Sequence, residues 1–99
     1  MSKNHNITIV TVTYNSMAVL PRMLDSISED IPIILIDNGS KDINKIRNLT
    51  NNKNIQLIEN GINIGFGAAC NIGAFRAKTK FVLFLNPDAI LNINTALID

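Results

Sequence analysis

Short apolar runs of strand length alternate with segments of helical periodicity along this chain. The strand-like runs are Ile7–Thr13, Ile33–Ile36, Ile55–Ile58 and Phe81–Leu85. The helical segments are marked by Leu20, Met23, Leu24 and Ile27, then by Ile43, Ile46 and Leu49, and finally by the small-residue stretch from Gly67 to Lys78. Strands that alternate with helices pair in parallel through right-handed crossovers. We therefore predict an α/β fold, an open parallel sheet with helices on both faces.

The start of the first helix is constrained by a proline and by polar residues before it. Asn15 and Ser16 follow the first strand and are candidate helix caps. Pro21 is compatible with a helix only in the first turn, because it lacks a backbone N–H.

The length of the chain suits one small domain. It has 99 residues, of which 46% are apolar, and no linker or repeat separates a second unit, so we assign residues 1–99 to a single domain. Residues 92–99 begin a helical pattern but are too few for a helix of ordinary length. We expect a truncated, N-terminal portion of a longer protein. A partial sheet would expose apolar surface and a strand edge, so self-association into a homo-oligomer is an expected outcome.

Composition excludes several classes of protein. Nine basic and eight acidic residues give a net charge of +1 without a basic run, so no nucleic-acid-binding surface is predicted. Cys70 and His5 are each alone, which excludes an internal disulfide and a thiolate metal cage. No apolar run approaches the roughly 20 residues that span a bilayer, and no signal peptide is recognised. We expect a cytoplasmic protein that meets a membrane, if at all, through regions outside this chain.

Polar clusters follow each predicted strand. They are Thr13-Tyr14-Asn15, Asp37-Asn38-Gly39-Ser40, Asn60 to Gly67, and Asn86-Pro87-Asp88. Each cluster alone could be only a turn. In an open parallel sheet, however, ligands bind beyond the carboxyl ends of the strands, where these clusters meet. Their arrival in order at one edge favours a binding site.

The chemistry of these clusters suits a nucleotide and a divalent cation. The carboxylate of Asp37 can accept the ring N–H of uracil, thymine or guanine, which cytosine lacks, and Tyr14 can pack on a base. Asp88 offers a hard oxygen ligand for Mg²⁺ or Mn²⁺, whose other positions would be filled by diphosphate oxygens and water.

The glycine-rich segment from Gly61 to Gly73 has two interpretations. Its helix N-terminus could offer N–H groups to phosphate, or its small residues could permit close packing of helix on sheet. Gly65-x-Gly67-x-x-Cys70 also nearly matches the dinucleotide fingerprint, which leaves an NAD-binding domain as an alternative. Cysteine at the third position, and a turn from Asn60 to Ile64 that is longer than this motif requires, count against that alternative.

Together these segments resemble the inverting family 2 glycosyltransferases, and among them the rhamnosyltransferase-like subgroup. The segments that carry the resemblance are Val12-Thr13-Tyr14-Asn15-Ser16, Ile36-Asp37-Asn38-Gly39-Ser40-Lys41-Asp42, Asn60 through Gly73, and Phe84-Leu85-Asn86-Pro87-Asp88. The resemblance spans Ile7 to Asp88, and Asn86-Pro87-Asp88 stands where many members have D-x-D.

The resemblance implies a GT-A fold, a UDP-, dTDP- or GDP-sugar donor, and Mg²⁺ or Mn²⁺. The implied nucleotide-binding residues are Thr13, Tyr14, Asn15, Asp37, Asn38, Ser40, Gly65, Asn71 and Asn86, and Asp88 is the implied metal ligand. Asp42 is expected to support its loop or the following helix. The catalytic base and the part that binds a saccharide or lipid-linked acceptor are expected downstream, so this chain alone should bind the donor without transferring sugar. A noncatalytic α/β interaction module is the remaining alternative.

Overall fold

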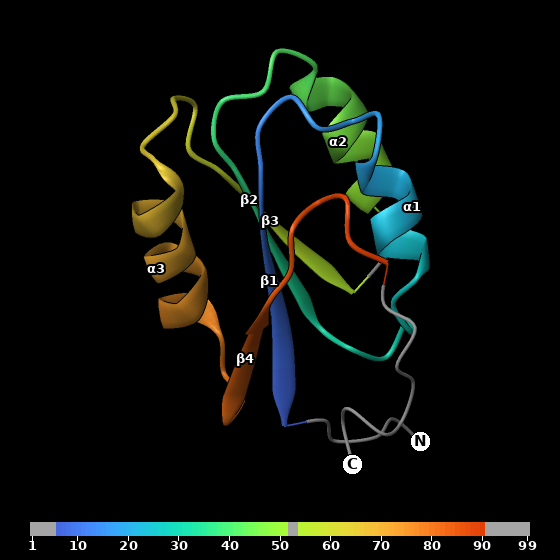
Figure 1. Ribbon diagram of the computed structural model, residues 1–99, viewed down its shortest axis with the longest axis vertical. Helices are drawn as coiled ribbons and strands as arrows, with labels where there is room; N and C mark the ends of the chain where they lie inside the picture. Colours follow the sequence, from blue (N-terminus) through green and yellow to red (C-terminus); the bar gives the residue numbers. More distant parts are fainter. Residues whose placement is uncertain (1–5, 52–53, 91–99) are drawn as a thin grey trace.

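The computed structural model describes residues 6–51 and 54–90 and contains an open sheet (Figure 1). The strands are β1 (Ile7–Thr13), β2 (Ile33–Asp37), β3 (Ile55–Glu59) and β4 (Phe81–Phe84), and the helices are α1 (Leu20–Asp25), α2 (Ile43–Thr50) and α3 (Phe66–Arg76). All strand pairs are parallel, in the order β3-β2-β1-β4. The predicted parallel α/β fold is confirmed. The helix predicted to begin near Asn92 lies outside the described residues.

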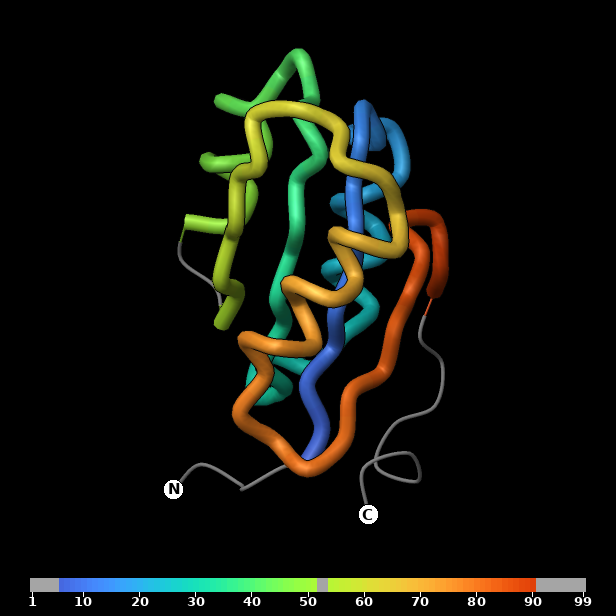
Figure 2. Tube along the Cα trace, turned by 90° about the vertical axis from the view of Figure 1, so that its left-hand side faces the viewer, coloured from blue at the N-terminus to red at the C-terminus, as the bar shows by residue number. Residues whose placement is uncertain are grey.

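The order of the strands reverses beside β1. From β1 the chain builds outward through β2 to β3, and α3 then returns it across the sheet to β4, on the other side of β1. Helices α1 and α2 cover one face of the sheet and α3 covers the other (Figures 1 and 2). Helices therefore lie on both faces, as predicted. The boundary between β1 and β4 is the point at which doubly wound sheets bind ligands.

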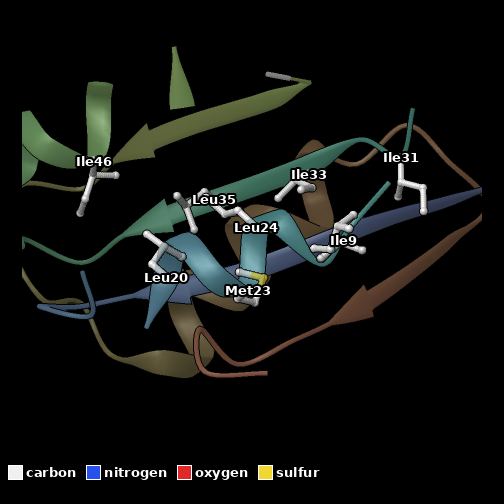
Figure 3. Packing of buried hydrophobic residues seen from close by; sticks show 9 residues of the cluster. Ile9, Leu20, Met23, Leu24, Ile31, Ile33, Leu35 and Ile46 are labelled. Carbon is white, nitrogen blue, oxygen red and sulfur yellow. The ribbon is translucent and has the colours of Figure 1, made fainter. Parts of the chain in front are cut away.

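The larger core lies between the sheet and α1 (Figure 3). Leu20, Met23 and Leu24 of α1 are buried against the sheet, where they meet Ile9 and Leu35 of the strands. All five residues of β2 are buried, as expected for a strand with neighbours on both edges and helices on both faces. The apolar run that predicted this strand thus reflects its central position.

Helix α3 approaches the sheet closely on the opposite face. A Cβ atom at Gly73 would lie 2.3 Å from Cγ1 of Val10, so only glycine fits there. Ala69 is fully buried in the same layer, beside Val10 and Ile36. Close packing therefore accounts for small residues at these two positions.

The cap predicted for α1 is wrong. Its N-cap residue is Val19, which makes no side-chain capping hydrogen bond. Asn15 has a φ of 52° and uses its Oδ1 to accept the N–H of Lys41, so its side chain serves the next loop instead. The backbone carbonyl of Ser16 accepts the N–H groups of Val19 and Leu20. Pro21 lies in the first turn, as predicted.

Candidate functional site

The loops after β1 and β2 are joined by hydrogen bonds at the carboxyl edge of the sheet. The backbone N–H of Asn38 donates to the carbonyl of Thr13 at 2.9 Å. The N–H of Asn15 donates to Oγ of Ser40 at 2.9 Å, and Oδ1 of Asn15 accepts the N–H of Lys41 at 2.9 Å. The structure thus brings together the first two polar clusters that the sequence placed at strand ends.

Asn38 extends this network to the loop after β3. Its Nδ2 donates to the carbonyl of Gly65 at 3.2 Å, and its Oδ1 accepts Nδ2 of Asn60 at 2.8 Å. Oδ1 of Asn63 accepts the N–H of Gly65 at 2.9 Å. Asn60 and Asn63 were not among the predicted site residues, although asparagine at turn positions was the signal for their role. Their side chains set the shape of the segment that leads into α3.

Asp37 lies inside the protein at this edge. It is 1% exposed, and its Oδ2 accepts the N–H groups of Gly39 and Ser40 at 3.1 and 2.9 Å. Its Oδ1 accepts the hydroxyl of Ser40. A carboxylate has about four lone-pair sites, so about one acceptor position remains. Because Asp37 is almost fully buried, recognition of a base by this position stays a prediction.

Thr13 and Tyr14 differ sharply in exposure, although they are neighbours at the end of β1. Tyr14 is 49% exposed, so its ring is accessible at the edge where the strand order reverses. Thr13 is fully buried, and its hydroxyl has no hydrogen-bond partner among the described residues. Tyr14 is therefore the residue of this pair that a ligand can reach directly.

The turn at Asn86, Pro87 and Asp88 lies beside β1, on the side of the sheet that α1 covers (Figure 1). Leu85 donates its N–H to the carbonyl of Val10 at 3.0 Å, so the chain leaves β4 still attached to β1. The carbonyl of Asn86 accepts the N–H of Ala89 at 3.0 Å, which closes a turn with Pro87 at its second position. The pairing of β4 with β1 thus places this turn nearer the amino end of β1 than the three linked loops, which lie beyond its carboxyl end.

The carboxylate of Asp88 projects from this turn into an exposed position. Among the described residues no group of three or more histidine, cysteine or acidic side chains could enclose a metal ion. A single exposed carboxylate can still hold Mg²⁺, because this ion usually keeps several waters and binds through one or two carboxylates plus substrate phosphates. Asp88 fits that mode of binding.

Gly65 and Asn71 lie on different parts of the α3 segment. Gly65 is the N-cap of α3 with a φ of 92°, and no side chain caps the first turn. Asn71 lines an open cleft with Ile58, Asn60 and Phe75, and that cleft includes none of Tyr14, Asp37 or Asp88. The structure does not bring Asn71 together with those residues, and its role in nucleotide binding stays a prediction.

The dinucleotide motif is poorly placed in this fold. In a dinucleotide-binding sheet the glycine-rich turn follows the first, central strand. Here Gly65 and Gly67 follow β3, which is an edge strand among the described residues. Burial also raises the pKa of the Cys70 thiol, the third position of the motif, which makes that side chain a poorer nucleophile.

In the part of the chain that the structure describes, no helix is long and apolar enough to cross a membrane.

Comparison with known families and structures gives a consistent result. A model of the family described as Glycosyl transferase family 2 matches residues 8–97. No curated protein sequence matches.

The fold is shared with solved glycosyltransferase structures. A crystal structure of S. aureus TarS 1–349 has a TM-score of 0.77 and 23% identity, covering 92% of this chain and 29% of that one. The same protein in complex with UDP gives 0.77 and 22%, covering 92% and 30%. The mannosyltransferase PcManGT from Pyrobaculum calidifontis, in complex with GDP-Man and Mn²⁺, gives 0.81 and 20%, covering 97% and 31%. The present chain thus spans 29–31% of the length of these structures.

Proposed function

The chain belongs to glycosyl transferase family 2, and we propose that it is the donor-binding, N-terminal part of an enzyme that transfers sugar from a nucleoside diphosphate. One observation carries the proposal. The segments that resemble the family's motifs follow the carboxyl ends of all four strands, and two of their side chains, Tyr14 after β1 and Asp88 after β4, are exposed beside the point where the strand order reverses. The complexes of the related folds with UDP and with GDP-Man and Mn²⁺ support it.

The base of the donor would bind beside Tyr14. Its ring, 49% exposed, can stack on a base, and this contact is insensitive to which base is present. Discrimination would come from the remaining acceptor position of Asp37, which suits the ring N–H of uracil, thymine or guanine. We therefore propose a UDP-, dTDP- or GDP-sugar as donor. Thr13, Asn15, Asn38 and Ser40 would act by holding the loops around the base.

The diphosphate would lie toward the turn of Asp88. This carboxylate would hold Mg²⁺ or Mn²⁺, and the bound ion would offset the charge that builds on the departing diphosphate. Asn86 is neutral and exposed, so it suits a hydrogen bond to ribose or sugar better than metal ligation. The turn closed by Asn86 and Ala89 fixes where these two side chains project.

The reaction would be a single displacement with inversion. The acceptor oxygen forms a bond to the anomeric carbon as the bond from that carbon to the diphosphate oxygen breaks, and a base removes the acceptor hydroxyl proton. None of the described residues is proposed as this base. The base and the site for a saccharide or lipid-linked acceptor would come from a region beyond this chain, so the chain alone would bind donor without turnover.

The finer assignments follow the same resemblance. The asparagine-glycine segment and Asn86-Pro87-Asp88 support a rhamnosyltransferase-like member. We propose with it a role in polysaccharide biosynthesis and a cytoplasmic location. Asp42 is the N-cap of α2 and makes no side-chain capping bond, so its proposed role is limited to a favourable charge at the start of that helix.

Thermal unfolding with nucleotides tests the proposal. The chain is heated with UDP, dTDP, GDP or NAD, each with and without Mn²⁺. A ligand present at about 100 times its dissociation constant stabilises the folded state by roughly 2.7 kcal/mol. We expect at least one nucleoside diphosphate to stabilise the chain in a Mn²⁺-dependent manner and NAD to have no effect.

Single substitutions test which residues are responsible for the stabilisation by nucleotides. Asp88→Asn should abolish the dependence on Mn²⁺, because it removes the charged ligand and keeps the shape of the turn. Tyr14→Ala should weaken binding of every nucleotide. Glu29→Gln removes an exposed carboxylate next to the start of β2, at the other end of the sheet, and should leave the response intact. Stabilisation by NAD alone, or a Mn²⁺-dependent response that survives Asp88→Asn, would refute the proposal.

A further inference from the structure

A cavity lies at the amino end of the sheet, opposite the candidate donor site. It has a volume of about 230 Å³ and lies between the end of α3 and the starts of β2 and β3. The residues that matter for its chemistry are Thr8, Asn54, Gln56, Arg76, Lys78 and Thr79. Figure 2 shows the segment after α3 turning below the strands on its way to β4. No residue assigned to nucleotide or metal binding lines this cavity.

Two cationic residues and no described carboxylate line the cavity. Arg76 and Lys78 line it, and none of its lining residues is acidic. Neither cation forms an ion pair with another described residue. The partial negative charge at the C-terminus of a helix accounts for Arg76, which lies in the last turn of α3. It does not account for Lys78, because Ala77 is already extended and the helix has ended before that lysine.

The neutral polar side chains of the cavity are of two kinds: amides with N–H groups to donate, and hydroxyls whose protons are already used in hydrogen bonds. The hydroxyl of Thr79 donates to the carbonyl of Phe81 at 2.8 Å, so Thr8 must donate to Thr79 in the hydrogen bond of 2.7 Å between them. Both hydroxyl protons are therefore used. The side-chain amides of Asn54 and Gln56 are exposed and have N–H groups to donate. The residues that line the cavity thus include a guanidinium, an ammonium and two amides, each of which has N–H groups that can donate to a ligand.

We propose that this cavity binds a phosphate group. A planar guanidinium and a lysine ammonium together are typical of sites that bind phosphate. Its volume of about 230 Å³ is many times what a single water molecule needs, and it leaves room for a phosphoryl group with a short attached group. The same chemistry would serve a soluble phosphomonoester or the headgroup of an anionic lipid.

Amide chemical shifts of the ¹⁵N-labelled chain test the proposal by position. Inorganic phosphate is titrated against chloride at constant ionic strength. We expect saturable shifts at Gln56 and in the segment from Arg76 to Thr79, and none at Tyr14 or Asp88. No saturable shift in this segment, or a shift confined to the carboxyl edge of the sheet, would overturn it. Because the affected amides lie at the opposite end of the sheet, the result is independent of nucleotide binding.

Charge variants provide the matched control. Arg76→Gln and Lys78→Gln should each weaken phosphate binding about tenfold, because each removes one charge-assisted hydrogen bond. Lys45→Gln on α2 removes the same charge from an exposed position outside the cavity and should have no effect. Circular dichroism establishes that each variant is folded. Equal weakening by all three variants would show that binding is diffuse attraction and would refute the site.

Two further measurements identify the source of the phosphate. Phosphatidic acid vesicles are compared with phosphatidylcholine vesicles by flotation, and glycerol 3-phosphate is titrated as the soluble counterpart. Vesicle binding that requires both phosphatidic acid and Lys78 supports a lipid headgroup. Saturable binding of glycerol 3-phosphate without vesicle binding supports a soluble phosphomonoester. Binding of vesicles that is unchanged in Lys78→Gln contradicts a role for the cavity.

Discussion

Individual polar side chains at the carboxyl edge of the sheet divide into those that build the loops and those that remain free. Asp37 and Asn38 are 1% and 3% exposed, and both use their side chains within the network. A buried polar group is costly unless it is hydrogen-bonded, so these bonds are a condition of their burial. The side chains of Tyr14 and Asp88 make no such bonds with other described residues, and both residues are exposed. We therefore expect direct contact with a ligand mainly from Tyr14 and Asp88.

Gly39 provides a test of how tightly the loops after β2 and β3 pack. Its φ is 91°, and a Cβ atom there would lie 3.1 Å from Cα of Ile62 and 3.2 Å from the carbonyl oxygen of Gly61. We expect Gly39→Ala to lower the free energy of unfolding by about 2–3 kcal/mol, through backbone strain and contact with backbone atoms that cannot easily move. Urea denaturation of the variant and the original chain measures the difference.

Gly61→Ala is the control for strain alone. Gly61 has a φ of 77°, but a Cβ atom there would have no neighbour within 4 Å. We expect a loss of about 1 kcal/mol from the left-handed backbone conformation only. If the two variants lose the same stability, the close approach of the two loops is not important to the fold.

At the scale of elements, the sequence predicted the strands and helices well and their ends less well. The spacing of apolar residues and the presence of β-branched side chains are local properties of the sequence, and they were enough to locate β1 and β2. The start of α1 was missed because the use of Asn15 depends on Lys41, which is close only in the folded chain. The clustering of polar loops at one edge followed from parallel topology. The burial of Asp37 did not follow, since it depends on hydrogen bonds from its own loop.

The packing of α3 on the sheet can be tested at Gly73. A Cβ atom there would lie 2.3 Å from Cγ1 of Val10, so Gly73→Ala should force the helix and β1 apart and cost about 1–3 kcal/mol. Gly67→Ala, in the first turn of the same helix, meets nothing within 4 Å and should stabilise by about 0.5–1 kcal/mol. Urea denaturation of both variants gives the comparison.

A double-mutant cycle connects the Gly73 result to the specific contact. Val10→Ala removes the two methyl groups that a Cβ at position 73 would strike. In that background Gly73→Ala should cost less than in the original chain, by about 0.5–3 kcal/mol of coupling. Additive effects of the two substitutions would show that the loss arises elsewhere.

Helix α2 is joined to β3 by an ion pair that should make stability depend on pH. Nε and Nη2 of Arg47 donate to the carboxylate of Glu59 at 2.8 and 2.6 Å. These hydrogen bonds, assisted by the positive charge, lower the pKa of Glu59 below its ordinary value of 4.5. A carboxyl with a lowered pKa in the folded state stabilises above its unfolded pKa, and this stability is lost as pH falls through the folded pKa.

The prediction is therefore a loss of stability below about pH 4.5 that depends on Arg47. Urea midpoints from pH 6 to pH 3 should fall less steeply for Arg47→Gln than for the original chain. The effect should be small, because both side chains are partly exposed. Arg22→Gln removes an exposed arginine of α1 and should leave the pH profile unchanged. Identical profiles for all three chains would contradict a contribution from the pair.

At the scale of the whole molecule, the two ends of the sheet have different chemistry. The carboxyl edge carries hydrogen-bonded loops with an exposed aromatic ring and an exposed carboxylate, which suits a nucleotide and a cation. The amino edge carries Arg76 and Lys78 around a cavity, which suits an anion alone. Since helices cover both faces, the ends and the outer edges of the sheet are where other molecules can approach.

The outer edge of β4 is the surface from which we expect self-association. Among the described residues β4 pairs only with β1, and Phe84 is 47% exposed on this strand. An unpaired apolar edge is a template for pairing with another chain. Burying a phenylalanine is worth about 1.5–3 kcal/mol, and a tenfold change in affinity corresponds to about 1.4 kcal/mol. Phe84→Lys should therefore weaken dimerisation at least about tenfold in sedimentation equilibrium.

The control is Phe75→Lys on α3. Phe75 is 88% exposed but lies on no strand edge, so this substitution should leave dimerisation unchanged. A chain that stays monomeric at all concentrations, or one that responds equally to both substitutions, would show that this edge does not direct association.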